Sequence, residues 1–265
     1  MNLIEKIKAV VKVDRFLFWM CAIGEPFMRP DFKEIMTALS ADHKVCPVTN
    51  LAYFGNDTPE YLTTINTKNI GMYWSVHWAE MKKHKVLAKT IERVSIMIES
   101  GIKIWPTIVA HPCYFNLLDD VLEAMKQLGL KLLLCRYRIG QSDLAQLEEE
   151  KQIEDKYRSH PNVDMSIWDI TPEAWKVAGG VCESGHKALV IDAWWRMATC
   201  HGDGNPNFFG SFPEDINKLP SRIRTPGICK SSKCPCKHLE FWGVNRKFPR
   251  SFADILYKWE EFMSS

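Results

Sequence analysis

Apolar residues follow two alternating patterns along the first half of the chain. Short, almost continuous apolar runs are bounded by glycine, proline or polar residues, which is typical of strands buried on both faces of a parallel sheet. Between these runs, apolar residues recur every three or four positions, which is typical of amphipathic helices. The runs predict strands over residues 16–23, 45–51, 70–76, 102–110 and 130–136. The helical spacing predicts helices over residues 3–13, 32–39, 85–100 and 117–128, with a helical turn at 59–65.

This alternation predicts an α/β fold with a parallel sheet or barrel. Right-handed crossovers bring the carboxyl ends of all the strands to one rim, where such folds bind their ligands. The series begins with a helix and has no strand before it. The polar residues expected on or near the rim are Glu25, Asn50, Ser75, His77, His111, Arg136 and Arg138.

The first predicted strand runs directly into the tripeptide Gly24-Glu25-Pro26. Gly24 allows a sharp turn or a close approach of the backbone to a ligand. Glu25 places a carboxylate at the carboxyl end of a buried strand, which makes it a candidate ligand-binding group. The alternative is an ordinary strand-turn-helix connection with an exposed acid.

The pattern changes after residue 140. Residues 144–158 predict a charged helix with most of its surface in solvent, and residues 159–178 predict an irregular linker. Two short apolar runs predict the arms of a hairpin, and a stretch rich in proline, serine and glycine predicts a loop. The runs are 188–191 and 194–199, the loop is 208–226, and a last helix begins at Ser251. We therefore expect three parts, residues 1–140, 141–180 and 181–265.

Composition narrows the class of protein. A chain of 265 residues is long enough for one large domain, or for one domain with a small appendage. A net charge of +2 argues against a broad phosphate-binding surface, so no nucleic acid is expected as a partner. No apolar run reaches membrane-spanning length, and the first residues lack the apolar core of a signal peptide. We therefore expect a cytoplasmic protein without a membrane partner.

Nine cysteines are many for a reducing compartment, where they more often bind metal or react than form disulfides. Zinc takes four nitrogen or sulfur ligands, and a [4Fe–4S] cluster takes four cysteines from scattered loops, so both metals stay open. The alternative, that these cysteines are small core residues, suits poorly a cluster that lies among Lys, Ser and Pro. Five candidates for four places crowd the second half: Cys182, Cys200, Cys234 and Cys236, with Cys229 as the reserve.

The two halves together resemble radical S-adenosylmethionine proteins with a C-terminal auxiliary iron–sulfur domain of the SPASM or shortened twitch type. The resemblance spans about residues 3–236 and rests on AIGEPFMRPDFKEIM, VTNL, WSVHWAE, VCESGHKALVIDAWWRMATCHGDGN and CKSSKCPC. It implies a partial (βα) TIM-like barrel that lacks its first strand. It also implies a small cysteine-rich domain over residues 181–265 that holds an auxiliary [4Fe–4S] cluster.

The resemblance further implies S-adenosylmethionine as a cofactor. Gly24, Glu25 and Pro26 match the segment that binds its amino group, and a carboxylate readily accepts hydrogen bonds from an ammonium. Ser75 matches the serine that contacts the ribose, and Asn50 lies where the family borders the cofactor. For Ser75 and Asn50 the alternative is capping of a strand end. The histidines and arginines of the rim would face the substrate, or would simply be solvated.

One departure from the family concerns its chemistry. The family cleaves S-adenosylmethionine at a [4Fe–4S] cluster held by a C-x3-C-x2-C motif, and this motif does not occur in the sequence. Cys21, inside the first predicted strand, is no substitute. Either the sequence starts late, at an internal methionine, or the chain is a shortened homologue that lost the chemistry. We therefore expect the polypeptide to be inactive in reductive cleavage.

Two functions follow from these observations. The first is a radical S-adenosylmethionine enzyme, whose intact form generates a 5′-deoxyadenosyl radical to modify a peptide, a protein or a small molecule. The second is a non-catalytic iron–sulfur or zinc-binding scaffold derived from that family. A C-x3-C-x2-C motif in frame upstream of Met1 would separate them.

Overall fold

The structure is a computed structural model. It describes residues 17–20, 24–52, 62, 65–136, 144–165, 181–182, 190–191, 196–198, 208–211 and 227–228. Contacts divide the chain into two units, residues 15–169 with the last residue, and residues 1–14 with 170–264. Most of the described residues belong to the unit of residues 15–169, which is called the sheet unit below. No helix in the described ranges is long and apolar enough to cross a membrane.

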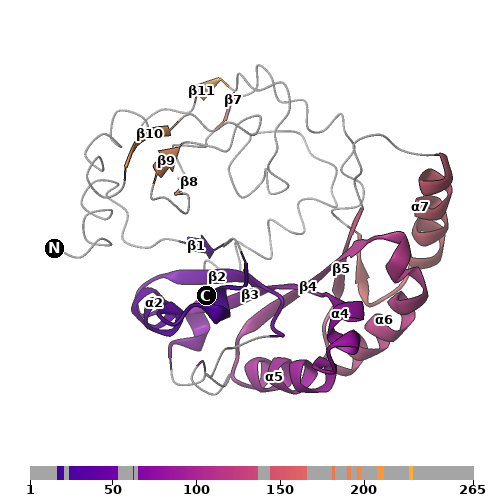
Figure 1. Cartoon of the computed structure of the whole chain (residues 1–265), viewed down its shortest axis with the longest axis horizontal. Coiled ribbons are helices and arrows are strands. Elements are labelled where there is room, and N and C mark those ends of the chain that lie inside the picture. The colour runs from indigo at the N-terminus through magenta and orange to yellow at the C-terminus, as the bar shows by residue number, and fades with distance from the viewer. Residues whose placement is uncertain are drawn as a thin grey trace. The chain divides into compact units, whose positions relative to one another are not determined.

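A six-stranded sheet forms the centre of the sheet unit (Figure 1). Its strands pair in chain order, and every neighbouring pair is parallel. The carboxyl ends of the strands therefore share one edge, which is called the carboxyl edge below. The strands are β1 (Leu17–Met20), β2 (Lys44–Thr49), β3 (Gly71–Ser75), β4 (Lys103–Ala110), β5 (Leu132–Arg136) and β6 (Val163–Asp164).

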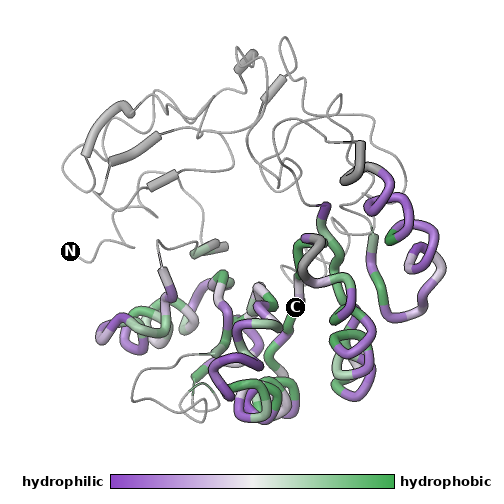
Figure 2. Tube along the Cα trace, turned by 45° about the vertical axis from the view of Figure 1, so that its right-hand side comes forward, coloured by the Kyte–Doolittle hydropathy of each residue, from purple (hydrophilic) through white to green (hydrophobic). Residues whose placement is uncertain are grey.

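Helices connect these strands. The α-helices are α2 (Phe32–Ser40), α4 (Trp78–Lys83), α5 (Leu87–Glu99), α6 (Leu118–Gln127) and α7 (Leu144–Tyr157), and the 3-10 helices are η1 (Pro26–Met28), η2 (Thr67–Asn69) and η3 (Pro112–Leu117). Each α-helix carries both apolar and polar residues along its length, as the green and purple segments of Figure 2 show. The apolar residues form one core with those of the sheet, in which Met36, Trp74, Met97 and Met125 are fully buried. This burial is what holds each helix on the sheet.

The predicted alternation of strands and helices is confirmed within the described residues. The five predicted strands correspond to β1–β5, and four predicted helices correspond to α2, α5, α6 and α7. The result is an α/β fold with a parallel sheet, which is the arrangement of part of a TIM-like barrel. The predicted helix at residues 3–13 and most of the predicted turn at 59–65 lie outside the described residues.

Sequence patterns missed several short elements, among them α4, β6 and β10. Helix α4 has six residues, which is less than two turns and too short to establish an apolar period. Strand β6 has two residues and lies in the stretch that was predicted to be an irregular linker. Strand β10 (Phe208–Ser211) occupies the start of the stretch that was predicted to be a loop. Each of the two strands is recognisable only through its pairing with a neighbour.

One face of α7, the helix predicted to have most of its surface in solvent, packs against the core. Ile153 and Tyr157 are 4% and 3% exposed, and they belong to the core. The Tyr157 hydroxyl also donates a hydrogen bond to Asp119 Oδ1 on α6 at 2.8 Å. The charged sequence of α7 hid these two apolar contacts.

The other unit contributes two small antiparallel sheets to the described residues. Strand β9 (Arg196–Ala198) pairs with β8 (Val190–Ile191) and with β10, so the hairpin predicted over 188–199 is confirmed. Strand β7 (Val181–Cys182) pairs with β11 (Gly227–Ile228). The helix predicted from Ser251 lies outside the described residues.

Candidate functional site

The polar residues predicted for the rim do follow the carboxyl ends of the strands. Glu25 lies in the connection after β1, Asn50 follows β2, Ser75 ends β3, His77 precedes α4, His111 follows β4, and Arg136 ends β5. Arg138 lies outside the described residues. The parallel sheet therefore brings six of the seven residues to the carboxyl edge.

The Glu25 side chain accepts three hydrogen bonds. Its Oε1 accepts hydrogen bonds from the Thr49 hydroxyl at 2.5 Å and from the Phe27 backbone N–H at 3.3 Å. Its Oε2 accepts one from the Asn50 backbone N–H at 2.8 Å. The carboxylate thus joins the connection after β1 to the end of β2. Because an ionised carboxylate oxygen accepts two hydrogen bonds, Oε2 keeps room for one more donor.

Burial raises the pKa of the Glu25 carboxyl above its ordinary value. The hydrogen bonds from Thr49, Asn50 and Phe27 and the nearby charge of His77 lower this pKa, but burial has the larger effect. Ionisation of the carboxyl therefore has a net cost in the folded protein. A ligand that brings a positive group to Oε2 would remove part of this cost.

We expect the Glu25 carboxyl to reduce the stability of the protein as the pH rises. Because its pKa is raised on folding, its stabilising contribution is complete below the ordinary pKa of 4.5 and is lost as the pH rises through the folded-state value. The measurement is the free energy of unfolding in urea from about pH 4 to about pH 6, for the wild type and for the variant Glu25→Gln. The wild-type free energy minus that of the variant should fall over this range. A difference that grows with pH would contradict the expectation.

Gly24, Pro26 and Ser75 are the other residues predicted, besides Asn50, to lie with Glu25 at the cofactor site. Gly24 has a φ of 94°, which side chains other than glycine rarely adopt, and no atom lies within 4 Å of a Cβ added there. Pro26 is buried at the first position of η1. Ser75 is half-buried, and its hydroxyl has no hydrogen bond to another described residue. The predicted ribose contact of Ser75 stays a prediction.

The chain turns sharply after β2, over residues 49–52. Leu51 is fully buried and has a φ of 55°, which is uncommon for a residue with a bulky side chain. The Leu51 N–H donates to Thr49 Oγ1 at 3.0 Å, and the Ala52 N–H donates to Asn50 Oδ1 at 2.8 Å. The Trp74 indole N–H on β3 donates to the Asn50 carbonyl oxygen at 3.0 Å. The sequence patterns placed Asn50 at this edge but gave no sign of the role of Trp74.

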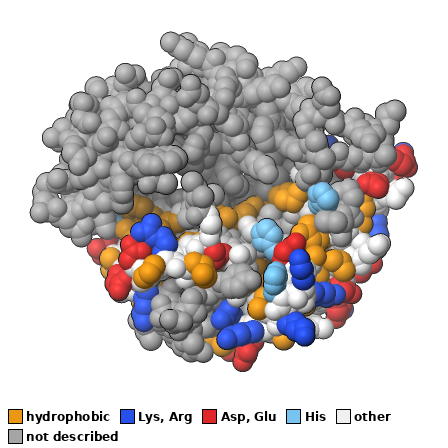
Figure 3. All heavy atoms as spheres, viewed as in Figure 1, with side chains coloured by type: hydrophobic (Ala, Val, Ile, Leu, Met, Phe, Trp, Pro, Cys, Tyr) orange, Lys and Arg blue, Asp and Glu red, His pale blue; other side chains and the backbone are white. Residues whose placement is uncertain are grey.

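The connections after β3 and β4 meet through polar side chains. The Tyr114 hydroxyl of η3 donates a hydrogen bond to Glu80 Oε2 of α4 at 3.2 Å, and the His111 and Tyr114 rings lie edge to face with centroids 6.3 Å apart. His77, just before α4, is exposed. In the view of Figure 3, histidine side chains lie close to acidic and basic ones on the surface of the sheet unit. These groups extend the polar part of the carboxyl edge beyond Glu25.

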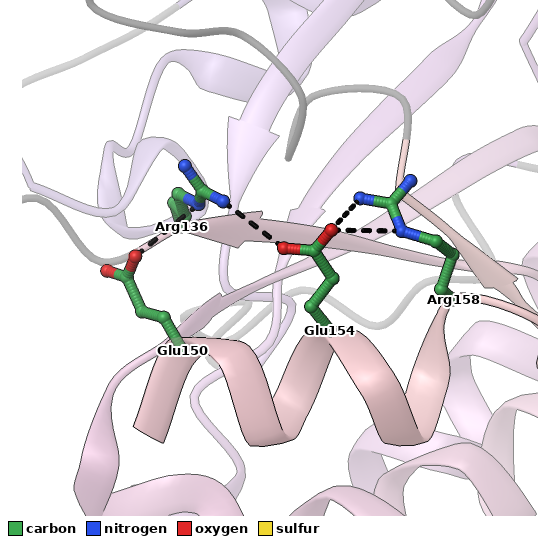
Figure 4. A network of polar contacts seen from close by, with 4 residues as sticks. All are labelled: Arg136, Glu150, Glu154 and Arg158. Atoms are coloured by element: carbon green, nitrogen blue, oxygen red, sulfur yellow. Dashed lines mark hydrogen bonds and ion pairs between the residues drawn. The ribbon is translucent and has the colours of Figure 1, made fainter. Parts of the chain in front are cut away.

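Arg136 contacts α7. Its Nε lies 3.4 Å from Glu150 Oε2 and its Nη2 lies 3.4 Å from Glu154 Oε2, as Figure 4 shows. Arg158 binds the other oxygen of Glu154, with its Nε at 3.1 Å. This arrangement favours a structural role for Arg136 over the substrate contact that the sequence suggested.

The predicted metal ligands lie largely outside the described residues. Cys200, Cys229, Cys234 and Cys236 are not described, and only the backbone of Cys182 is described, in β7. Within the described residues, no group of three or more His, Cys, Asp or Glu side chains is arranged to hold a metal ion. Cys46 and Cys135, on β2 and β5, are buried and form no disulfide. The metal site therefore stays a prediction.

Comparison with known proteins shows a similarity of fold. No protein-family model matches the sequence, and no curated protein gives a significant match. Among solved structures, the chain is similar to SuiB from Streptococcus suis, with a TM-score of 0.52 and 14% identity over 83% of this chain. It is also similar to SuiB bound to S-adenosylmethionine, with a TM-score of 0.52 and 15% identity over 84% of this chain.

The likeness to SuiB is one of architecture. The chain spans 59% and 61% of the two SuiB chains. At this level of identity, the similarity shows that the two proteins share a fold, and leaves the activity of this chain to be inferred from its own residues.

Proposed function

We propose that this chain is an iron–sulfur protein of the radical S-adenosylmethionine superfamily. In its intact form it would generate a 5′-deoxyadenosyl radical to modify a peptide, a protein or a small molecule. The observation that carries the proposal is the Glu25 carboxylate, which is held at the carboxyl edge by three donors and has a raised pKa. The shared fold with SuiB, which has been solved with S-adenosylmethionine bound, supports it.

The residues at the carboxyl edge fit S-adenosylmethionine. Glu25 Oε2 has room for one donor from the cofactor's ammonium. The side-chain nitrogen of Asn50 donates no hydrogen bond to another described residue, so it is available to the cofactor's carboxylate or ribose oxygens. Ser75 offers its hydroxyl from the end of β3, and Gly24 leaves the backbone open for a close approach. Together these groups would bind and orient the cofactor.

Binding and cleavage are separate in this proposal. In the resembling family, a [4Fe–4S] cluster held by a C-x3-C-x2-C motif supplies the electron for cleavage of S-adenosylmethionine, and the sequence lacks this motif. Glu25, Asn50 and Ser75 supply contacts but no electron. We therefore propose that the polypeptide as given binds the cofactor without cleaving it.

The second half of the chain is proposed to hold the auxiliary cluster. Residues 181–265 would form the cysteine-rich domain, joined to the barrel part, residues 1–140, by residues 141–180. The ligands would be Cys182, Cys200, Cys234 and Cys236, with Cys229 as the reserve. The absence of the C-x3-C-x2-C motif from the sequence favours a second candidate function, a non-catalytic iron–sulfur or zinc-binding scaffold.

The test is cofactor binding by the full chain, reconstituted with iron and sulfide under anaerobic conditions. We expect equilibrium dialysis to detect weak binding of radiolabelled S-adenosylmethionine, and Glu25→Ala to weaken it about tenfold or more, because a hydrogen bond to a charged group is lost. Glu99→Ala, at an exposed position at the end of α5, is the matched control and should bind like the wild type.

The same samples test cleavage when dithionite is added and 5′-deoxyadenosine is measured by mass spectrometry. We expect none above the level without protein. Equal binding by the wild type and Glu25→Ala would overturn the cofactor site. Formation of 5′-deoxyadenosine that survives replacement of Cys182 and Cys234 would show a cleaving cluster elsewhere in the chain.

A further inference from the structure

Arg93 is a buried cation on α5 to which the proposed function gives no role. It is 9% exposed and lies on the same helix face as Thr90, Val94 and Met97, which are all fully buried. Arginine is rarely buried without a partner. Its Nη1 donates a hydrogen bond to the carbonyl oxygen of Ala52 at 2.9 Å, across 41 positions of the sequence. The side chain therefore reaches from α5 to the turn that follows β2.

The backbone of this turn is held from three directions. Glu25 accepts the Asn50 N–H, the Trp74 indole donates to the Asn50 carbonyl oxygen, and Arg93 donates to the Ala52 carbonyl oxygen. Between these fixed groups lies Leu51, with its positive φ. A bulky residue keeps such a conformation only where its surroundings impose it. The three contacts supply that constraint.

These hydrogen bonds also determine which polar groups of the turn are left to bind a ligand. The carbonyl oxygens of Asn50 and Ala52 already accept hydrogen bonds from Trp74 and Arg93. The side chain of Asn50 accepts from the Ala52 N–H through its oxygen, so its nitrogen is left to donate. Because the Ala52 N–H holds the side-chain oxygen of Asn50, a shift of the Ala52 peptide would move the side-chain amide of Asn50. The Asn50 N–H that fixes Glu25 would move with it.

We propose that Arg93 is a positioning residue for the cofactor site. The inference rests on the proposed function, since the site that it positions is the proposed site for S-adenosylmethionine. Arg93 itself makes no contact with the cofactor. Its charged hydrogen bond holds the turn so that the Asn50 side chain and the Glu25 carboxylate keep their places at the carboxyl edge.

The test compares four variants of the full chain. Arg93→Met removes the donor and keeps a similar length, Arg93→Lys keeps a charged donor, and Trp74→Phe removes the second donor to the turn. Val94→Ala, at a fully buried position on the same helix, lowers stability but leaves in place the three hydrogen bonds that hold the turn. Binding of S-adenosylmethionine is measured by equilibrium dialysis at a temperature where urea titrations show every variant to be folded. Hydrogen exchange of the amides at residues 49–52 is measured in parallel.

We expect Arg93→Met to weaken binding about tenfold or more, the cost of one charge-assisted hydrogen bond. Arg93→Lys should bind within about threefold of the wild type, and Val94→Ala should bind like the wild type. Trp74→Phe should weaken binding in the same direction, and it carries the test if Arg93→Met does not fold. Amides of the turn should exchange faster in Arg93→Met and Trp74→Phe than in Val94→Ala.

The possible failures are distinguishable. If the wild type does not bind S-adenosylmethionine, the proposed function is overturned. If the wild type binds and Arg93→Met binds equally well, only the positioning role is overturned. A loss of binding in Val94→Ala as large as that in Arg93→Met would assign the effect to general stability. Unchanged exchange at residues 49–52 in Arg93→Met would overturn the positioning role whatever the cofactor does.

Discussion

Replacing Cys182 and Cys234 together by alanine is expected to remove nearly all iron and sulfide from the reconstituted protein. A [4Fe–4S] cluster takes about four thiolates, and five cysteines are proposed for these places. A single replacement could be compensated by Cys229, but the double replacement leaves three. Strand pairing supports a shared site, because Cys182 is in register with Gly227, two residues before Cys229 in the sequence.

The metal measurement has two matched controls and two clear outcomes. Cys46→Ala and Cys135→Ala remove buried thiols from the sheet unit, so they should leave the metal content unchanged. Iron, zinc and acid-labile sulfide are measured after anaerobic reconstitution. We expect about four iron and four sulfide per chain in the wild type. Stoichiometric zinc without sulfide would replace the iron–sulfur assignment, and iron retained by the double variant would show that the ligands are misassigned.

Replacing Arg136 by methionine is expected to lower the free energy of unfolding by about 2 kcal/mol. The guanidinium lies between two carboxylates of α7, and the Glu150 side chain is only 12% exposed. Without Arg136, the Glu150 charge stays largely buried and loses one ion-pair partner, which is the costly way to break an ion pair. Methionine keeps most of the apolar stem of the side chain, so the decrease in the free energy of unfolding reflects the lost charge.

Arg158 provides the matched control for this measurement, because it binds the same Glu154 from a more exposed position, with 43% of its side chain accessible. Arg158→Met should cost about 0.5 kcal/mol or less, as exposed ion pairs usually do. Urea denaturation measures both values. Adding Glu150→Gln to Arg136→Met should recover part of the loss, since it removes the charge that has lost its ion pair with Arg136. Equal losses in the two arginine variants would contradict this account.

The fold of the sheet unit was largely predictable, because it follows from local patterns. The apolar run before Gly24 and the glycines that end α5 and α6 mark β1 and two helices through their immediate neighbours alone. Contacts between distant residues were not predictable in this way. The docking of α7 depends on the bond between Tyr157 and Asp119, 38 positions apart, and a charged sequence concealed it.

The position of the candidate site was predictable, but the hydrogen bonds that hold its residues were not. Glu25, Asn50 and Ser75 could be placed at one edge because parallel strands share their carboxyl ends. Two of the three bonds that fix Glu25 come from residues 24 and 25 positions away, so no local motif reveals them. Arg93 did leave a signal, since it is a charged residue in line with the buried stripe of α5. The cysteines of the second half remain a prediction from spacing and resemblance.

The order of the strands has a consequence for how the chain acquires its structure. Strands β1 to β6 lie in the sheet in the same order as in the sequence, so each strand pairs with the one made just before it. The hydrogen bond from Arg93 to Ala52 closes a loop of 41 positions. Because such loops cost little entropy to close, the sheet can grow by one strand and one helix at a time during synthesis. Assembly from the N-terminal side would complete the pairing of β1 with β2 before β5 emerges from the ribosome. The hydrogen bond from Thr49 to Glu25 would form at the same early stage.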